Sequence, residues 1–372
     1  MNDTENPGLY LHIPFCRSKC PYCGFYSVPS TSLVPRWLEA LQKEIIHYKD
    51  RFDRFDSLYL GGGTPTCLDV GTLRKIMETL LAHFDFAADT EMTIEANPGD
   101  LSEEKIIAIK DVGFNRISLG VQAFDDRTLS YLGRTHTSLE AEKALTNLRT
   151  FGFENIGVDL IYGYEGQTVK TWKNTLEKAL SFQPEHLSCY ELTFEKGTLF
   201  SRWQQKGIIK PLTEKELSTL FTTTSNFLQD HGYVHYEISN FAREAIYTSR
   251  HNQKYWKHIP YLGLGPSAHS FQDSTRWWNV RSIRAYCKTL ESGEAPIEGH
   301  ESLTKEQLIL ESISLGSRTR EGFDLNEIPP DTISSENLSK LKDAGYILIK
   351  NNRVIPTQTG FLVADHLPLL FV

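Results

Sequence analysis

The sequence predicts an α/β fold, in which a partial (β/α)6, TIM-like barrel precedes a small, mainly helical C-terminal domain. Two observations lead to this fold class. The first 195 residues alternate short β-rich segments with amphipathic helical ones, and glycine or polar residues gather just after the strands. Such alternation is typical of parallel strands joined by helical crossovers, and the carboxyl ends of such strands are where barrels build their sites.

The elements of the barrel can be assigned in order along the chain. Strands are expected at residues 9–13, 57–60, 91–95, 116–119, 156–161 and 186–192. Helices are expected between them at residues 34–48, 71–83, 102–111, 139–150 and 171–181. Asp100 and Glu103 form a capping-box pattern at the third helix, while Gly113 and Gly152 follow two helices where a left-handed cap is favoured.

A different pattern begins near Leu303. Helices are expected at residues 304–317 and 335–345, followed by a hairpin with Asn351 and Asn352 at its turn and by an apolar segment at 361–371. This order resembles a winged helix. The second helix carries as many acidic as basic residues, which favours a packing role over DNA binding. We therefore expect a core barrel at 1–235, a connecting segment at 236–300 and a C-terminal domain at 301–372.

Composition and charge narrow the class of protein. The chain is 40% hydrophobic and 23% charged, as in ordinary globular proteins, and its net charge of −8 gives no basic footprint for a nucleic acid. No apolar run approaches the roughly 18 residues that a membrane-spanning helix requires. The N-terminus MNDTENPGLY has neither the basic nor the apolar region of a signal peptide. These features predict a cytoplasmic protein.

Three of the six cysteines lie close together, in CRSKCPYC directly after the first strand. Clustered thiols in a protein of this type bind metal more often than they form disulfides. Cys16, Cys20 and Cys23 can hold an iron–sulfur cluster while leaving one iron open to another ligand. The alternative is a zinc site completed by His12. Cys67, Cys189 and Cys287 are expected to be small buried residues, not ligands.

Four further segments place polar groups after strands. They are GGGTPT from Gly61, EANP from Glu95, VQ ending at Gln122, and DLIYG from Asp159. If these residues only formed turns, the glycines would be explained, but the carboxylates and the amide would not. We therefore expect these segments to line one site at the carboxyl edge of the strands.

The cysteine loop, with Tyr22 before its third cysteine, resembles the signature of the radical S-adenosylmethionine (SAM) superfamily. Six further segments, YLHIPFC, GGGTPT, IEANP, ISLGVQ, GVDLIYG and YEISN, together with the region from Leu303, are similar to the branch that contains oxygen-independent coproporphyrinogen III dehydrogenase (HemN) and the haem chaperone HemW. The resemblance implies a 4Fe–4S cluster on the three cysteines, SAM as cofactor, and reductive cleavage of SAM to methionine and a 5′-deoxyadenosyl radical.

The same resemblance implies the residues that would bind SAM. They are Tyr10, Gly61, Gly62, Gly63, Thr64, Glu95, Gln122, Arg134 and Asp159. Carboxylates, an amide and a guanidinium suit an amino acid, a sulfonium and ribose hydroxyls. One segment departs from the branch, because Tyr164 and Glu165 stand where relatives usually have Leu-Pro. This loop follows Asp159 in the sequence, so the difference does not affect the cluster.

Two functions of different classes remain open within the branch. One is a haem chaperone whose partners are haem and haem-accepting proteins, with membrane respiratory proteins among the candidates. The other is a porphyrinogen dehydrogenase of porphyrin biosynthesis. Relatives of the dehydrogenase type usually have a further cysteine where this chain has Phe25, and a longer segment before the first strand. Both differences favour the chaperone. Whether SAM is cleaved or only bound stays open from the sequence.

The segment RHNQKYW, from Arg250 to Trp256, resembles the HNxxYW motif associated with haem binding in HemW. By that resemblance His251 is a haem ligand, since a neutral imidazole is a good axial ligand for haem iron. If the segment is helical, His251 and Tyr255 share a face. The alternative is that His251 is an ordinary hydrogen-bonded histidine and that Tyr255 and Trp256 belong to the core.

Overall fold

Parallel strands form the centre of the main sheet in a computed structural model that describes residues 5–371. The parallel part runs in the order β9-β1-β2-β3-β4-β5-β6. Its strands are β1 (Gly8–Ile13), β2 (Phe55–Gly62), β3 (Phe86–Ala96), β4 (Arg116–Gln122), β5 (Ile156–Tyr162), β6 (His186–Glu191) and β9 (Tyr261–Leu264). The six expected strands and the α/β class are confirmed, and β9 is an addition that the sequence did not suggest.

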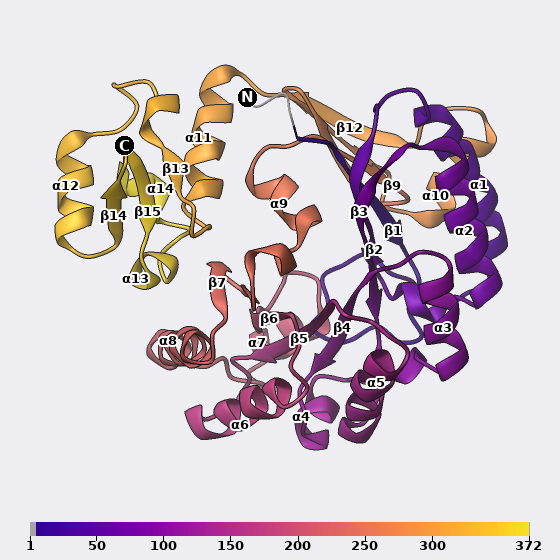
Figure 1. Cartoon of the computed structure of the whole chain (residues 1–372), viewed down its shortest axis with the longest axis horizontal. Coiled ribbons are helices and arrows are strands. Elements are labelled where there is room, and N and C mark those ends of the chain that lie inside the picture. Colours follow the sequence, from indigo (N-terminus) through magenta and orange to yellow (C-terminus); the bar gives the residue numbers. More distant parts are fainter. Residues whose placement is uncertain (1–4, 372) are drawn as a thin grey trace.

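Helices cover the outer side of these strands (Figure 1). They are α1 (Val34–Tyr48), α2 (Val70–His83), α3 (Glu103–Asp111), α4 (Asp126–Tyr131), α5 (Ser138–Thr150) and α6 (Val169–Leu180), with the short 3-10 turns η1 (Pro65–Cys67) and η2 (Pro98–Asp100). Five of these helices match the expected ones to within about two residues at each end. Gly113 and Gly152 have φ of 109° and 82°, which confirms the left-handed caps.

The capping box expected from Asp100 and Glu103 is wrong. The N-cap of α3 is Ser102, whose hydroxyl accepts a hydrogen bond from the backbone N–H of Lys105. The Asp100 carboxylate lies in the preceding turn and pairs with Arg17 at 2.5 Å. It is therefore two residues too early to cap the helix.

The register of the strands arranges the barrel interior in layers. Gly8 pairs with Ser57, and Ser57 with Glu91, in the first layer. Two residues further along each strand, a second layer contains Tyr10, Tyr59, Thr93 and Arg116. A third layer contains His12, Gly61, Glu95 and Ser118. Because alternate residues face opposite sides of a strand, the apolar residues between these layers pack against the helices, and the interior is polar.

Residues 196–302 extend the main sheet on both sides. Beyond β6 lie β8 (Asn240–Ala242) and β7 (Val234–Glu237), and beyond β9 lie β10 (His269–Gln272), β11 (Thr275–Asn279) and β12 (Ile297–Ser302), so that the sheet has twelve strands within the described residues. The helical parts are α7 (Leu199–Gln205), α8 (Glu214–Asp230), η3 (Ala245–Tyr247), α9 (Arg250–Trp256) and α10 (Ile283–Glu291). The domain boundaries expected at 235 and 300 stay a prediction, and residues 1–4 and 372 of the outer domains lie outside the described part.

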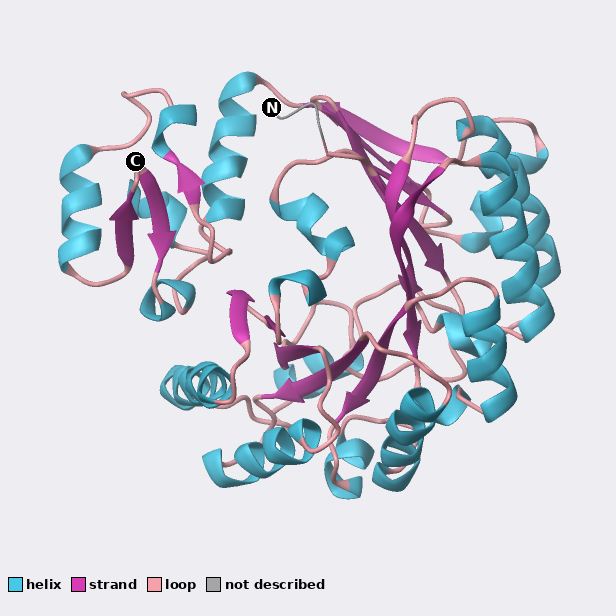
Figure 2. Cartoon of the chain, in the orientation of Figure 1, coloured by secondary structure: helices cyan, strands magenta, loops and turns pink. Residues whose placement is uncertain are grey.

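A separate three-stranded sheet follows with its own helices (Figure 2). The elements are α11 (Lys305–Gly316), β13 (Phe323–Asp324), η4 (Leu325–Glu327), α12 (Ser335–Asp343), β14 (Ile347–Lys350), β15 (Arg353–Pro356), α13 (Gln358–Phe361) and α14 (Leu367–Phe371). Asn351 and Asn352 have φ of 50° and 60°, so the two-residue hairpin turn is confirmed. In residues 5–371 no helix combines the length and the apolar character needed to cross a bilayer.

Candidate functional site

The cysteine loop leaves β1 and is closed at its base by backbone hydrogen bonds. The N–H of Cys16 donates to Val28 O at 3.2 Å, and the N–H of Val28 donates to Pro14 O at 2.8 Å. A turn inside the loop brings the N–H of Cys23 within 3.1 Å of Cys20 O. Cys16, Cys20 and Cys23 are free and half-buried. The loop therefore presents three thiols from one rigid segment.

Two neighbouring segments hold this loop against the sheet. The N–H groups of Gly63 and Thr64 donate to Ile13 O and Phe15 O at 2.8 and 2.7 Å, and Cys16 Sγ lies 3.5 Å from Thr64 Oγ1. A Cβ on Gly63 would lie 2.4 Å from Phe15 O, so this approach requires glycine. On the other side, the Arg134 guanidinium donates to Cys20 Sγ at 3.4 Å. The predicted cluster and SAM segments are thus in contact.

Zinc ligation by His12 would require this imidazole to give up a hydrogen bond. Both ring nitrogens of His12 have partners, since Nδ1 lies 3.1 Å from Tyr10 Oη and Nε2 lies 2.8 Å from Tyr26 O. Thiolates on one zinc ion would lie about 4 Å apart, given a Zn–S distance of roughly 2.3 Å. Within residues 5–371 no three His, Cys, Asp or Glu side chains converge closely enough to hold one metal ion. His12 is therefore not the fourth ligand of a Cys3His site in this arrangement.

Burial disfavours ionisation of the Cys23 thiol. It raises the pKa of the Cys23 thiol, and the nearby thiols of Cys20 and Cys16 raise it further. The iron of a cluster would supply the positive charge that favours thiolate ligands. The donor set thus fits the group that the motif predicts.

Glu95 joins the glycine loop to the barrel interior. Its carboxylate accepts hydrogen bonds from Tyr59 Oη at 2.9 Å and from the N–H of Gly62 at 3.1 Å. Burial raises the pKa of Glu95 to about 7, although the Tyr59 hydrogen bond opposes the shift. A cationic ligand beside this carboxylate would favour its ionised form. Gly62 has φ of 103°, and a Cβ there would lie 2.4 Å from the His12 ring.

Gln122 and Arg134 carry buried polar atoms without a protein partner. Gln122 is a non-glycine residue at φ of 67°, next to an irregularity in the β4–β5 pairing, and its Oε1 has no hydrogen bond. Arg134 donates to Gly120 O at 2.9 Å and to Asn97 Oδ1 at 3.2 Å, but its Nε has no partner. Strained backbone and unsatisfied buried groups concentrate at binding sites, where a ligand completes them. These atoms fit a polar ligand such as SAM.

Asp159 lies on β5, where it pairs with Gly120 of β4. Its carboxylate accepts hydrogen bonds from Ser118 Oγ at 3.2 and 3.1 Å. Burial raises the pKa of Asp159, against the hydrogen bonds from Ser188 and Ser118. The nearby charge of Asp159 also raises the pKa of Glu95, so the two carboxylates face the same interior.

Sequence reasoning missed two interior residues that support the predicted ones. Tyr59 Oη donates a hydrogen bond to Glu95, and Ser118 Oγ donates one to Asp159. Tyr59 and Ser118 precede Gly61 and Gly120 by two residues. The alternation of a strand was therefore a signal that could have found both of them.

His251 lies apart from the cysteines, at the opposite end of the strands. Its side chain is 1% exposed, with Nδ1 3.2 Å from Ser57 Oγ and Nε2 2.9 Å from Tyr255 Oη. Burial lowers the pKa of His251 to about 3, so the ring is neutral at physiological pH. The expected shared face with Tyr255 is confirmed. In this structure the imidazole is hydrogen-bonded at both nitrogens, which is the environment that the alternative interpretation described.

The chain is similar in sequence to several known proteins of one superfamily. A sequence model of the radical SAM superfamily matches residues 10–179. The chain is 36% identical to a protein named heme chaperone HemW from Synechocystis, over 86% of this chain and 80% of that protein. It is 34% identical to the heme chaperone HemW of Bacillus subtilis, over 96% of each chain.

A solved structure and a mitochondrial protein extend these similarities. The structure of coproporphyrinogen III oxidase (HemN) from Escherichia coli, described as a radical SAM enzyme, superposes with a TM-score of 0.84 at 24% identity, over 99% of this chain and 90% of that one. This likeness shows the fold. A mouse protein named radical S-adenosyl methionine domain-containing protein 1, mitochondrial, is 33% identical over 86% of this chain and 74% of that protein.

Proposed function

Because the chain belongs to the HemW family of the radical SAM superfamily, we propose that it is a haem chaperone, which binds haem and transfers it to acceptor proteins. The observation that carries this proposal is similarity to HemW over 96% of both chains in the Bacillus subtilis comparison. The similarity thus covers the cysteine loop, the segment around His251 and the C-terminal unit together.

Cys16, Cys20 and Cys23 would hold a 4Fe–4S cluster, and SAM would complete the open iron. Tyr10, the backbone of Gly61, Gly62 and Gly63, Thr64, Glu95, Gln122, Arg134 and Asp159 would bind SAM. When bound, the two cofactors supply one-electron chemistry at that iron. The unpartnered Gln122 Oε1 and Arg134 Nε are the polar atoms that SAM would satisfy.

His251 would be an axial ligand of the haem that the protein carries. A ligand nitrogen must offer its lone pair to iron, and Nε2 of His251 is 2.9 Å from Tyr255 Oη. Haem ligation therefore requires that this hydrogen bond breaks and that the buried ring becomes accessible. The proposal thus includes a movement of α9 on haem binding.

The proposed partners are haem and the proteins that accept it, among them membrane respiratory proteins. We place the protein in the cytoplasm, where reduced thiols persist. The porphyrinogen dehydrogenase function is less well supported, because its support is a fold likeness at 24% identity. Phe25, which stands where such relatives usually carry a further cysteine, is 66% exposed beside the cluster loop.

A haem titration tests the proposed function. Haem is added to wild-type protein and to His251→Gln, and the visible spectrum and dissociation constant are measured. We expect wild type to bind haem with the spectrum of a histidine-ligated iron, and His251→Gln to lose that spectrum and at least tenfold in affinity. His235→Gln is the matched control, because His235 is also buried with partners at both ring nitrogens. Equal spectra and affinities for His251→Gln and wild type would remove His251 as the ligand.

Anaerobic reconstitution with iron and sulfide tests the cluster. We expect about four irons per chain in wild type, and loss of the cluster absorbance in Cys20→Ser. Cys67→Ser is the control, because Cys67 is half-buried and its thiol pKa is raised by burial and by nearby charges that include Cys16. An intact cluster in Cys20→Ser, or one zinc ion in place of a cluster, would contradict the assignment.

A further inference from the structure

His251 occupies the first layer of the barrel interior, where it fills the space left by a glycine. A Cβ on Gly8 would lie only 2.8 Å from His251 Nδ1, and Ser57 Oγ lies 3.2 Å from the same nitrogen. Gly8 begins β1, and Ser57 is the third residue of β2. The imidazole therefore forms part of the floor of the barrel, at the end opposite the cysteine loop.

Two tyrosines of the second layer lie on this imidazole. The ring centroids of Tyr10 and Tyr59 are 6.0 and 5.4 Å from that of His251, with interplanar angles of 26° and 31°. Their hydroxyls bond in the third layer, where Tyr10 Oη lies 3.1 Å from His12 Nδ1 and Tyr59 Oη donates to Glu95. Each tyrosine thus connects the floor with the level at which SAM is expected.

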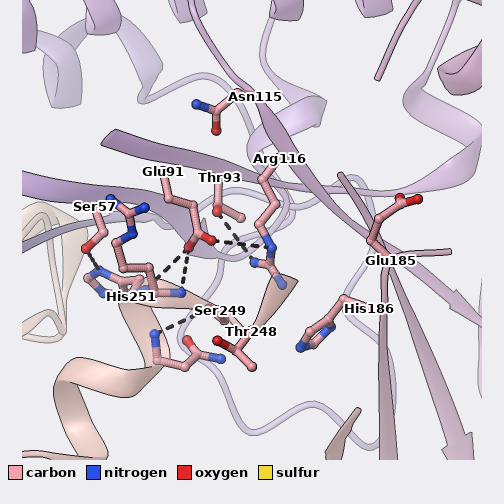
Figure 3. A network of polar contacts seen from close by, with 12 residues as sticks. Ser57, Glu91, Thr93, Asn115, Arg116, Glu185, His186, Thr248, Ser249 and His251 are labelled. Atoms are coloured by element: carbon pink, nitrogen blue, oxygen red, sulfur yellow. Dashed lines mark hydrogen bonds and ion pairs between the residues drawn. The ribbon is translucent and has the colours of Figure 1, made fainter. Parts of the chain in front are cut away.

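The first turn of α9 is held in place by polar contacts (Figure 3). The Glu91 carboxylate accepts hydrogen bonds from the N–H groups of Arg250 and His251 at 2.9 and 3.4 Å. Glu91 is 9% exposed, and Arg116 Nε lies 3.9 Å from its other oxygen. Water can replace hydrogen bonds of this kind when the turn moves away from the floor.

We propose that His251 is a positioning residue for the SAM site, acting through Tyr10 and Tyr59, so that haem ligation by His251 and SAM binding weaken one another. The inference rests on the proposed function, in which His251 ligates haem. An imidazole on the floor supports both tyrosines and keeps Glu95 oriented. An imidazole on haem iron cannot do this, since it must leave the interior to become accessible.

The expected coupling has a definite sign. SAM binds the state in which Tyr59 donates its hydrogen bond to Glu95, so it stabilises the state with His251 inside the barrel. Haem binds the state in which His251 has left the barrel interior, so it stabilises that second state. Because coupling between two ligands is reciprocal, each should weaken the other by the same factor, and typical couplings correspond to roughly 5- to 150-fold.

The experiment is a haem titration of cluster-loaded protein without reductant, in the absence and in the presence of saturating SAM. We expect SAM to weaken haem binding at least fivefold in wild type. Tyr59→Phe keeps the ring on His251 but removes the hydroxyl that holds Glu95, so the effect of SAM on haem affinity should shrink. Tyr346→Phe, in the C-terminal unit, should retain the full effect.

A second measurement tests the positioning role without haem. SAM binding to the haem-free, cluster-loaded protein is measured by equilibrium dialysis, and His251→Ala should bind SAM severalfold more weakly than wild type or His235→Gln. If haem binding depends on His251 but SAM leaves the haem affinity unchanged, the inference is overturned and the proposed function stands. If haem binding is the same in His251→Gln and wild type, the proposed ligand and this inference both fail.

Discussion

Glu44 is a buried carboxylate whose hydrogen-bond partners are neutral. It lies on α1 and accepts from the N–H of Gly265, from Asn279 Nδ2 and from Tyr286 Oη. Burial raises the pKa of Glu44 to about 7, although these three hydrogen bonds oppose the shift. This side chain connects α1 with α10, with β11 and with the residue that follows β9, and it makes the stability of the protein depend on pH.

The raised pKa predicts that Glu44 destabilises the folded state as pH rises. Between the ordinary pKa of 4.5 and about 7, the folded protein keeps the Glu44 proton while the unfolded chain has lost it. The free energy of unfolding therefore falls through this range, by about 3 kcal/mol in total at 1.36 kcal/mol per pKa unit, and stays level above it. Glu44→Gln removes this contribution, so denaturant unfolding should show the stability of Glu44→Gln relative to wild type rising by about 2.5 kcal/mol between pH 5 and pH 8.

The control for this measurement lies on the same helix. Glu39 is exposed on α1, so Glu39→Gln removes a carboxylate from the same helix without removing a buried one. Other buried carboxylates contribute equally to wild type and to both variants, so they cancel in the comparison. A difference between Glu44→Gln and wild type that does not change with pH would contradict the prediction.

At the scale of elements, α9 is a short helix that depends on charged contacts. Lys254 Nζ lies 2.8 Å from the Asp56 carboxylate and donates to Asn6 O at 2.8 Å. The Lys254 side chain is 3% exposed and that of Asp56 is 17% exposed. A seven-residue helix is marginal on its own, so these contacts determine whether it stays on the barrel.

Removal of the Asp56 charge is expected to release α9. Asp56→Asn leaves the buried Lys254 ammonium without its counter-charge, which costs about 3 kcal/mol when one partner of a buried pair is removed. Hydrogen exchange measured by mass spectrometry should show faster exchange in residues 250–256 and unchanged exchange in the barrel strands. Adding Lys254→Met should restore protection, because the unpaired charge is then gone.

An exposed ion pair of the same helix gives the control. Arg250 contacts Asp89 at 3.3 Å, and the Asp89 side chain is 79% exposed. Asp89→Asn should therefore change the protection of α9 by less than about 1 kcal/mol. Equal effects of Asp56→Asn and Asp89→Asn would show that burial of the pair does not stabilise the helix.

The elements that the sequence predicted are those with strong local signals. The strands β1 to β6 lie between clear amphipathic helices, and the hairpin turn carries two asparagines. The strands β7 to β12 were missed because most of them are short, and β9 also pairs with β1, which is distant in the chain. The helix α8 was missed although Thr213 and Glu216 form a capping box that is visible in the sequence.

The candidate site also has one part that motifs predict and one part that they do not. Cysteines, glycines and carboxylates after strands stand in recognisable motifs, so the upper part of the barrel could be predicted from them. The floor could not be predicted, because Ser57 and Glu91 are single polar residues whose contacts with α9 span 194 and 160 residues of sequence. Only the folded sheet brings them to His251.

At the scale of the whole molecule, the chain has two main cores. One runs from Leu9 to Leu290 and contains the barrel with its extensions. The other contains Ile313, Ile347, Val354 and further residues of the C-terminal unit. Backbone hydrogen bonds join the two units, from Arg320 to Tyr236 O and from Ile238 to Arg318 O. Tyr236 Oη also lies 2.7 Å from His186 Nε2, so this junction reaches the barrel interior.

Two cores predict that the C-terminal unit can unfold while the barrel stays folded. Ile347 is fully buried in the second core, so Ile347→Ala should cost that unit about 2 to 5 kcal/mol. Hydrogen exchange measured by mass spectrometry should then accelerate in residues 305–371 and remain unchanged in β1 to β5, because local openings involve only the contacts that they break. Leu348→Ala is the control, since Leu348 follows on the same strand but is 56% exposed, and it should leave both regions unchanged. Equal acceleration of the barrel strands in Ile347→Ala would mean that the junction through Tyr236 makes the two units one cooperative structure, in which a change at the C-terminal unit is transmitted to the floor of the barrel.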